Sequence, residues 1–247
     1  MALIGMKDVS WGFGGTPLID GVTFHIEKGQ RVCLLGRNGA GKSSLFKLLQ
    51  GKMSPDSGEV WRQREVTVAE LAQDVPPGFD GTIFDVVAGG LGENGETIAE
   101  IRRLNQNALP EADGDAAARQ AALQHRIEAD GGWELQRHIE SVLTRTQLEP
   151  EAPFATLSAG MKRRVLFARA LAQDPDVLLL DEPTNHLDVA AIEWMESFIG
   201  KNIKTLWFIT HDRAFLKSLA NRIMELDRGR LVAYDCDYET YLERRQA

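Results

Sequence analysis

The chain has 247 residues and a formal net charge of −8 at pH 7, and 43% of its residues are hydrophobic, which suits one large α/β domain or two small ones. The acidic balance argues against a broad basic face for gripping nucleic acid. Cys33 and Cys236 have no metal-like spacing, and no signal-peptide core or membrane-spanning apolar run is present, so we expect reduced thiols in a soluble, cytoplasmic protein.

The first part of the chain favours short strands joined by glycine-rich turns. Apolar, β-rich runs predict strands over residues 3–9, 22–26, 31–35, 59–61 and 66–71. A glycine-rich turn covers residues 12–15, and a second glycine loop covers residues 36–41. Residues 43–49 have the apolar spacing of a helix.

The composition changes at residue 82. From there to residue 147 the chain is rich in Ala, Glu, Gln and Arg and poor in β-branched residues, which predicts four helices. Breaks are expected near residues 92–95, 110–115 and 130–132. We therefore predict a helical insertion in an otherwise α/β domain.

Strands and helices alternate again in the last third. Helices are predicted over residues 162–173 and 189–199 and just after Asp212, and strands over residues 177–180, 205–209, 222–226 and 230–234. Residues 238–247 resemble the opening of a polar helix.

Residues 36–43, Gly-Arg-Asn-Gly-Ala-Gly-Lys-Ser, fit the pattern G-x-x-x-x-G-K-[ST] between a predicted strand and helix, the context that this pattern requires. The glycines let successive N–H groups point at phosphate oxygens, and the helix N-terminus adds its donors and dipole. Lys42 supplies a charge to the β- and γ-phosphates, and Ser43 a hydroxyl to Mg²⁺. The predicted nucleotide-binding residues here are Gly36, Arg37, Asn38, Gly39, Ala40, Gly41, Lys42, Ser43 and Ser44.

Two carboxylates follow the apolar run 177–180. Ligands of open α/β sheets bind beyond the carboxyl ends of the strands, so Asp181 and Glu182 are aimed at the bound molecule. We predict that Asp181 holds Mg²⁺ through water, opposite Ser43, and that Glu182 orients and deprotonates the attacking water. The alternative for either acid is a cap on the following segment.

Residues 157–164, Leu-Ser-Ala-Gly-Met-Lys-Arg-Arg, precede a predicted helix, for which Ser158 alone would be a good N-cap. Together with the phosphate loop and the two acids, this segment resembles the signature motif of ATP-binding cassette (ABC) ATPases. The resemblance covers essentially the whole chain in the family's order. It implies one cassette over residues 1–247, an α/β P-loop fold with a RecA-like mixed sheet and an antiparallel β subdomain. Residues 82–150 and about 158–172 would form the inserted helical subdomain.

The resemblance also implies roles for residues outside these three motifs. Phe13 resembles the aromatic residue that stacks on adenine, with Trp11 as a rival and a core position as the alternative. Gln73 resembles the Q-loop glutamine that reaches Mg²⁺ and the nucleophilic water, although it could equally be a solvated strand residue.

Two more positions match the family near the end of the chain. Asp188 resembles the D-loop aspartate. His211 resembles the switch histidine that contacts the γ-phosphate, and the alternative for His211 with Asp212 is a helix cap.

The signature departs from the usual L-S-G-G-Q, because Ala159 replaces a glycine and Met161 replaces the glutamine, while Ser158 and Gly160 remain. In this family the signature of one domain closes over ATP held by another. The resemblance therefore implies head-to-tail pairing with a second ABC domain, in the same polypeptide or in a homodimer. An isolated domain should bind ATP but hydrolyse it weakly.

Residues 182–188, Glu-Pro-Thr-Asn-His-Leu-Asp, and 210–216, Thr-His-Asp-Arg-Ala-Phe-Leu, are similar to the ABC-F subfamily. Residues 11–26, 32–38 and 227–230 resemble the first nucleotide-binding domain of Uup-type proteins. Such proteins carry two cassettes joined by a charged helical linker and have no membrane domain. The resemblance implies that residues 238–247 begin this linker, and that the partners are the ribosome in translation and branched DNA.

The sequence also allows alternatives to an ABC-F protein. The chain could be the ATPase subunit of a transporter that docks on separate membrane permeases. A chromosome-structuring protein of the SMC kind is a third possibility. The stretch of sequence between Ser43 and Leu157 argues against it, because it is too short to contain a long coiled coil. A non-hydrolysing ATP sensor is kept open by the altered signature, although Lys42, Glu182 and His211 are all present.

Overall fold

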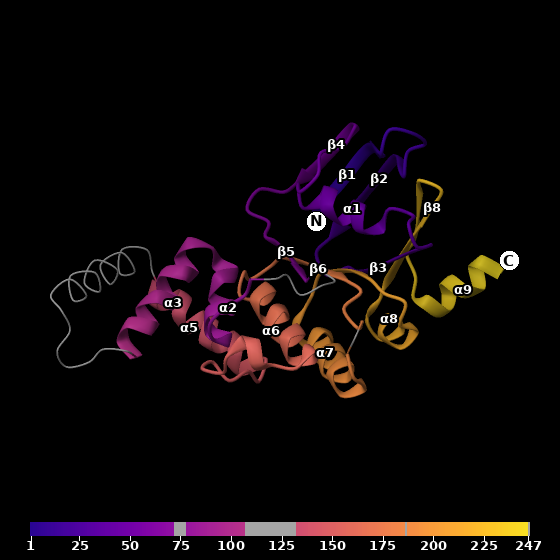
Figure 1. The fold of residues 1–247 in the computed structure, drawn as a ribbon. Helices are drawn as coiled ribbons and strands as arrows, with labels where there is room; N and C mark the ends of the chain where they lie inside the picture. Colours follow the sequence, from indigo (N-terminus) through magenta and orange to yellow (C-terminus); the bar gives the residue numbers. More distant parts are fainter. Residues whose placement is uncertain (72–77, 107–131, 186, 247) are drawn as a thin grey trace. The chain divides into compact units, whose positions relative to one another are not determined.

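The structure is a computed structural model that describes residues 1–71, 78–106, 132–185 and 187–246 (Figure 1). The chain divides into two compact units. The first unit contains residues 1–73 and 175–247, and the second contains residues 74–174. Gln73, one of the predicted site residues, lies outside the described residues.

A three-stranded antiparallel sheet forms one part of the first unit, with the order β2-β1-β4. Its strands are β1 (Ala2–Trp11), β2 (Ile19–Glu27) and β4 (Ser57–Arg62). Alternate residues of β2 are buried, as expected for a sheet with one face on the core. β1 extends beyond the predicted residues 3–9 because its pairing with β2 continues to Trp11, opposite Ile19.

A six-stranded sheet forms the other part, with the order β5-β6-β7-β3-β8-β9. Its strands are β3 (Arg31–Gly36), β5 (Val68–Leu71), β6 (Val177–Asp181), β7 (Leu206–Ile209), β8 (Arg222–Asp227) and β9 (Arg230–Tyr234). All pairings are parallel except that of β8 with β9. Every residue of β6 and β7 is buried, which explains why their sequences are continuous apolar runs rather than alternating ones.

The helices of the first unit are α1 (Lys42–Leu49), α7 (Val189–Asn202), α8 (Arg213–Leu219) and α9 (Tyr238–Gln246). Asp188 caps α7 by accepting a hydrogen bond from the Ala191 N–H, and Asp212 caps α8 in the same way. The other end of α7 is capped by Arg31 of β3, whose guanidinium donates to two C-terminal carbonyl groups.

The second unit is helical in the residues that the structure describes. Its elements are α2 (Ile83–Ala88), η1 (Gly89–Leu91), α3 (Glu93–Gln106), α5 (Gly132–Arg145), η2 (Phe154–Thr156) and α6 (Ala159–Leu171). A capping box of Thr82 and Asp85 starts α2 at the predicted point. Three α-helices and the short 3-10 helix η1 thus occupy the described part of residues 82–147, and the expected break at 110–115 lies outside it.

The helix predicted over residues 162–173 begins earlier, at Ala159. The reason is the Ser158 side chain, whose Oγ accepts a hydrogen bond from the Met161 N–H at 3.3 Å. Arg169 fastens the same helix to α2 through a hydrogen bond of 2.8 Å to the Val86 carbonyl. The structure confirms the predicted α/β fold with a mixed sheet, an antiparallel sheet and a helical insertion. No helix in the described ranges has both the length and the apolar character needed to cross a membrane.

Candidate functional site

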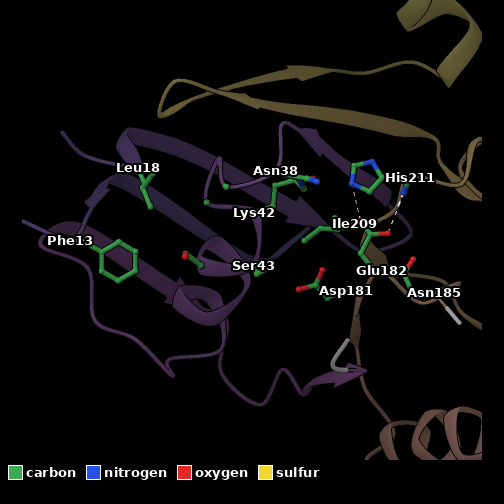
Figure 2. A pocket seen from close by; sticks show the side chains of 13 residues that line it. Phe13, Leu18, Asn38, Lys42, Ser43, Asp181, Glu182, Asn185, Ile209 and His211 are labelled. Carbon is green, nitrogen blue, oxygen red and sulfur yellow. Dashed lines mark hydrogen bonds and ion pairs between the residues drawn. The ribbon is translucent and has the colours of Figure 1, made fainter. Parts of the chain in front are cut away.

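A cavity of about 460 Å³ opens in the first unit where β3, β6 and β7 end (Figure 2). This is the edge at which open α/β sheets bind their ligands. All residues that line it belong to the first unit, so its geometry does not depend on the placement of the second. The lining residues are Phe13, Leu18, Asn38, Gly39, Gly41, Lys42, Ser43, Ser44, Asp181, Glu182, Asn185, Ile209 and His211.

The loop between β3 and α1 forms one wall of the cavity. Gly39 and Gly41 have φ angles of 78° and 101°, in the left-handed region that glycine adopts without strain. Gly36 is required for a different reason, because a Cβ there would lie 2.6 Å from the carbonyl oxygen of Leu226 in β8. The loop therefore begins in direct contact with β8 and turns its backbone toward the cavity.

Lys42 is the first residue of α1, and its ammonium group folds back over the loop. Nζ donates hydrogen bonds to the carbonyl oxygens of Gly36 at 2.8 Å and Arg37 at 3.1 Å. The pKa of Lys42 lies below its usual value, because partial burial lowers it more than the negative charges of Glu182 and Asp181 raise it. The lysine and the two acids thus act on one another across the same cavity.

Asp181 ends β6, pairs with Ile209 at the end of β7, and is only 8% exposed. Glu182 follows with a φ of 46°, a left-handed conformation that is uncommon for a residue other than glycine. Its backbone N–H donates to the Ile209 carbonyl at 3.0 Å. The tight turn that results points both carboxylates into the cavity, and such strain is typical of functional sites.

His211 lies directly on the carboxylate of Glu182 (Figure 2). The Nε2 atom is 3.2 Å from Oε1 of Glu182, and the backbone N–H of His211 donates to Oε2 at 3.3 Å. The Glu182 side chain is 11% exposed, whereas the imidazole of His211 is 64% exposed. An exposed imidazole thus covers a buried carboxylate.

Phe13 stands at the opposite end of the cavity from His211 (Figure 2). Its ring is 83% exposed and meets Trp11 edge to face, with centroids 4.7 Å apart. Trp11 is 7% exposed and belongs to the core beneath it. Of the two rivals, Phe13 is therefore the ring that a ligand can reach, and the alternative of a core position does not hold for it.

The oxygen atoms at the cavity fit Mg²⁺. Ser43 and Asp181 both line it and offer a hydroxyl and a carboxylate, the hard donors that Mg²⁺ takes. Within the described ranges, no group of three or more His, Cys, Asp and Glu side chains could hold a metal alone. Since Mg²⁺ commonly completes its shell with water and substrate phosphates, this donor set suits a cation that arrives with a nucleotide.

Comparison with known proteins identifies the family. A model of the family described as "ABC transporter" matches residues 19–185. The chain belongs to the ABC transporter family. This ABC domain is 40% identical to the ATP-binding protein Uup of Haemophilus influenzae, over 100% of the chain and 38% of that protein. It is 32% identical to the energy-dependent translational throttle protein EttA of Mycobacterium tuberculosis, over 97% of the chain and 43% of that protein.

The similarity to solved structures concerns the fold. The ATP-binding cassette MJ1267 of an ABC transporter superposes with a TM-score of 0.72 at 17% identity, over 100% of this ABC domain and 97% of that chain. The predicted resemblance to ABC ATPases and to Uup-type proteins is thus confirmed. The chain spans about two fifths of the length of the curated relatives it matches.

The predicted signature residues lie in the second unit, at the start of α6. Ala159 is the first residue of that helix and has no positive φ, so its methyl group is compatible with the backbone. Gly160 and Met161 follow in the same turn, in which the Ser158 side chain accepts a hydrogen bond from the Met161 N–H. Asp188, in the first unit, caps α7 in this structure.

Three of the residues that line the cavity were not predicted from the sequence. Leu18 and Ile209 contribute apolar wall, and Asn185 lies beside the acids. Asn185 stands within the quoted run 182–188 and could have been singled out, whereas nothing local marks Leu18. Three predicted residues of the loop, Gly36, Arg37 and Ala40, do not line the cavity themselves, and the first two instead hold the Lys42 ammonium.

Proposed function

We propose that this ABC domain binds ATP with Mg²⁺ in the cavity and hydrolyses it to ADP and phosphate. The observation that carries the proposal is the convergence, in one cavity at the edge of the sheet, of a glycine loop, a lysine and two strand-end carboxylates. These are the parts that phosphoryl transfer to water needs: a cradle for phosphate, a positive charge, a metal ligand and a base.

The phosphates would lie along the loop and the N-terminus of α1. Backbone N–H groups of residues 38–43 and the helix dipole favour negative charge there. Lys42 would exchange the two loop carbonyls that it now contacts for phosphate oxygens, which are stronger acceptors because they are charged. The adenine would stack on Phe13, the exposed ring at the far end of the cavity.

Hydrolysis would use Glu182 as the base. A water molecule held by its carboxylate attacks the γ-phosphorus, the proton passes to the carboxylate, and the bond to the β–γ bridging oxygen breaks to release ADP. His211 would hold the carboxylate in place and contact the γ-phosphate from the open side. Ser43 and Asp181 would hold Mg²⁺, which neutralises part of the phosphate charge when bound.

The site is expected to be complete only in a pair of ABC domains. The N-terminus of α6, with Ser158, Ala159, Gly160 and Met161, is a helix start whose N–H donors and dipole favour an anion. Head-to-tail pairing would place it against the ATP of a second domain. We therefore propose weak turnover by a single domain and full turnover by the pair.

The names of two relatives support a proposal for the biological role. EttA is named a translational throttle, and Uup an ATP-binding protein. We propose that this domain is one of two cassettes of a cytoplasmic ABC-F protein, in which the nucleotide state controls action on the ribosome, with branched DNA as a further partner. The second candidate, a transporter subunit, is favoured by the description of the family itself. Co-sedimentation of the full protein with ribosomes or with membranes distinguishes them.

The nucleotide site is tested by titrating the chain with a fluorescent ATP analogue. Lys42→Ala should abolish measurable affinity because the phosphate charge loses its counter-charge. Lys47→Ala is the matched control, since Lys47 lies exposed on the same helix and does not line the cavity. Equal affinity of all three proteins would refute the proposed phosphate site.

A further inference from the structure

Helix α9 packs on the rest of the first unit through an aromatic cluster. All three tyrosines of the chain gather where β9 leads into this helix. Tyr241 is 1% exposed, meets Tyr234 edge to face at 5.1 Å, and stacks on Tyr238 at 6.0 Å. Since most other side chains of α9 are exposed, Tyr241 is its main apolar anchor.

Glu225 of β8 completes the anchor with both oxygens of its carboxylate. The Tyr241 hydroxyl donates to Oε2 at 2.9 Å, and Nη2 of Arg245 lies 3.1 Å from Oε1. The Glu225 side chain is 18% exposed, so solvent screens these contacts only partly. Glu225 therefore joins α9 to β8, in addition to the ion pair at 2.9 Å between Lys217 of α8 and Glu239 of α9.

The same part of β8 supports the phosphate loop. In the parallel pairing of β3 with β8, Glu225 lies opposite Leu35 and Leu226 lies opposite Gly36. Gly36 is the first residue of the loop, and its backbone is so close to the Leu226 carbonyl that no Cβ would fit. A displacement of β8 at Glu225 must therefore move the start of the loop.

The β8–β9 hairpin precedes α9 in Figure 1. It also contacts the turn after β1, which carries the cavity residue Leu18. The Gly229 carbonyl, at the turn of the hairpin, accepts a hydrogen bond of 2.8 Å from the N–H of Asp20. A Cβ at Gly229 would lie 3.3 Å from the carbonyl oxygen of Pro17. Leu18, which lines the cavity, stands between Pro17 and Asp20. The hairpin thus contacts both the start of the phosphate loop, at Gly36, and the turn that carries Leu18.

We propose that Glu225 is a positioning residue that couples the docking of α9 to nucleotide binding. A docked α9 holds β8, and β8 holds the phosphate loop in the shape that receives ATP. Because coupling is reciprocal, bound ATP stabilises the docked helix to the same extent. The inference rests on the proposed ATP site, and it makes α9 an element through which the chain that follows the hairpin senses the nucleotide.

The test compares Tyr241→Ala, which removes the anchor, with Leu242→Ala, which changes the next, exposed residue of the same helix. Docking is measured by hydrogen exchange of α9 amides, and affinity by ATP titration. We expect Tyr241→Ala to speed α9 exchange and weaken ATP binding by about fivefold or more, the lower end of usual couplings. Tyr241→Phe, which keeps the ring but removes the hydrogen bond to Glu225, should weaken ATP binding less than Tyr241→Ala but more than Leu242→Ala, which should change neither quantity. ATP should slow α9 exchange in the unaltered chain.

Faster α9 exchange in Tyr241→Ala with unchanged ATP affinity would overturn the coupling. Unchanged exchange would also overturn it, because Tyr241 would then not be the anchor. Should Tyr241→Ala fail to fold, Glu225→Gln replaces it, since it keeps the shape but removes the charge, and the same outcomes apply. Failure of the unaltered chain to bind ATP would instead refute the proposed function.

Discussion

Replacing Gly36 by Ala tests the contact between the phosphate loop and β8. The added Cβ would lie 2.6 Å from the Leu226 carbonyl oxygen, whereas real Cβ atoms keep at least 3.0 Å, so the two strands must separate by several tenths of an ångström. Overpacking of this kind costs about 1–3 kcal/mol. For a chain of this size that corresponds to a loss of roughly 2–12 °C in Tm, at about 2–4 °C per kcal/mol. ATP affinity should fall as well, since the loop starts at this residue.

The assay is thermal unfolding with and without ATP. Gly15→Ala is the matched control, because its Cβ would meet no atom within 4 Å and its φ is not positive. We expect the control to unfold within about 1 °C of the unaltered chain, as surface substitutions usually do. A Gly36→Ala protein that unfolds at the same temperature as the control would refute this prediction. Strands β3 and β8 would then have moved apart at this point without a loss of stability.

Three further predictions concern other contacts. Arg31→Met should lower the free energy of unfolding by about 1–3 kcal/mol, because the C-terminal carbonyls of α7 lose their donor. In urea unfolding, the midpoint should fall while the m-value stays unchanged. His211→Ala should leave ATP affinity within about threefold but lower single-turnover hydrolysis by at least about 10-fold, since Glu182 loses its orienting partner; equal turnover would contradict it. Phe13→Ala should weaken ATP binding by about 1–3 kcal/mol in a titration with no change in Tm, because the ring is exposed.

Much of the site could be predicted because its parts are local in the sequence. The glycine spacing of the loop defines which backbone positions can turn, and the apolar runs before Gly36 and Asp181 place both at strand ends. Ligands of open α/β sheets bind beyond the carboxyl ends of the strands. That rule places both the loop that carries Lys42 and the acid Asp181 at the ligand-binding edge of the sheet, although β7 lies between their strands.

Other features depend on contacts between distant segments and were not predictable. The contact between Glu182 and His211 requires β6 and β7 to be neighbours, and the left-handed φ of Glu182 has no marker in its residue type. Leu18 reaches the cavity because the turn after β1 folds back over the loop. The polar composition of α9 predicted a solvated helix and concealed the single buried tyrosine.

The central claim is that Glu182 is the base of ATP hydrolysis in this cavity. The most direct measurement is ATP affinity and turnover of Glu182→Gln in the presence of a second ABC domain, with Glu193→Gln, an exposed carboxylate of α7, as control. We expect the ATP affinity of Glu182→Gln to stay within about threefold and its turnover to fall by about 10²–10⁴-fold, the usual contribution of a general base. Turnover equal to that of the Glu193→Gln control would contradict it.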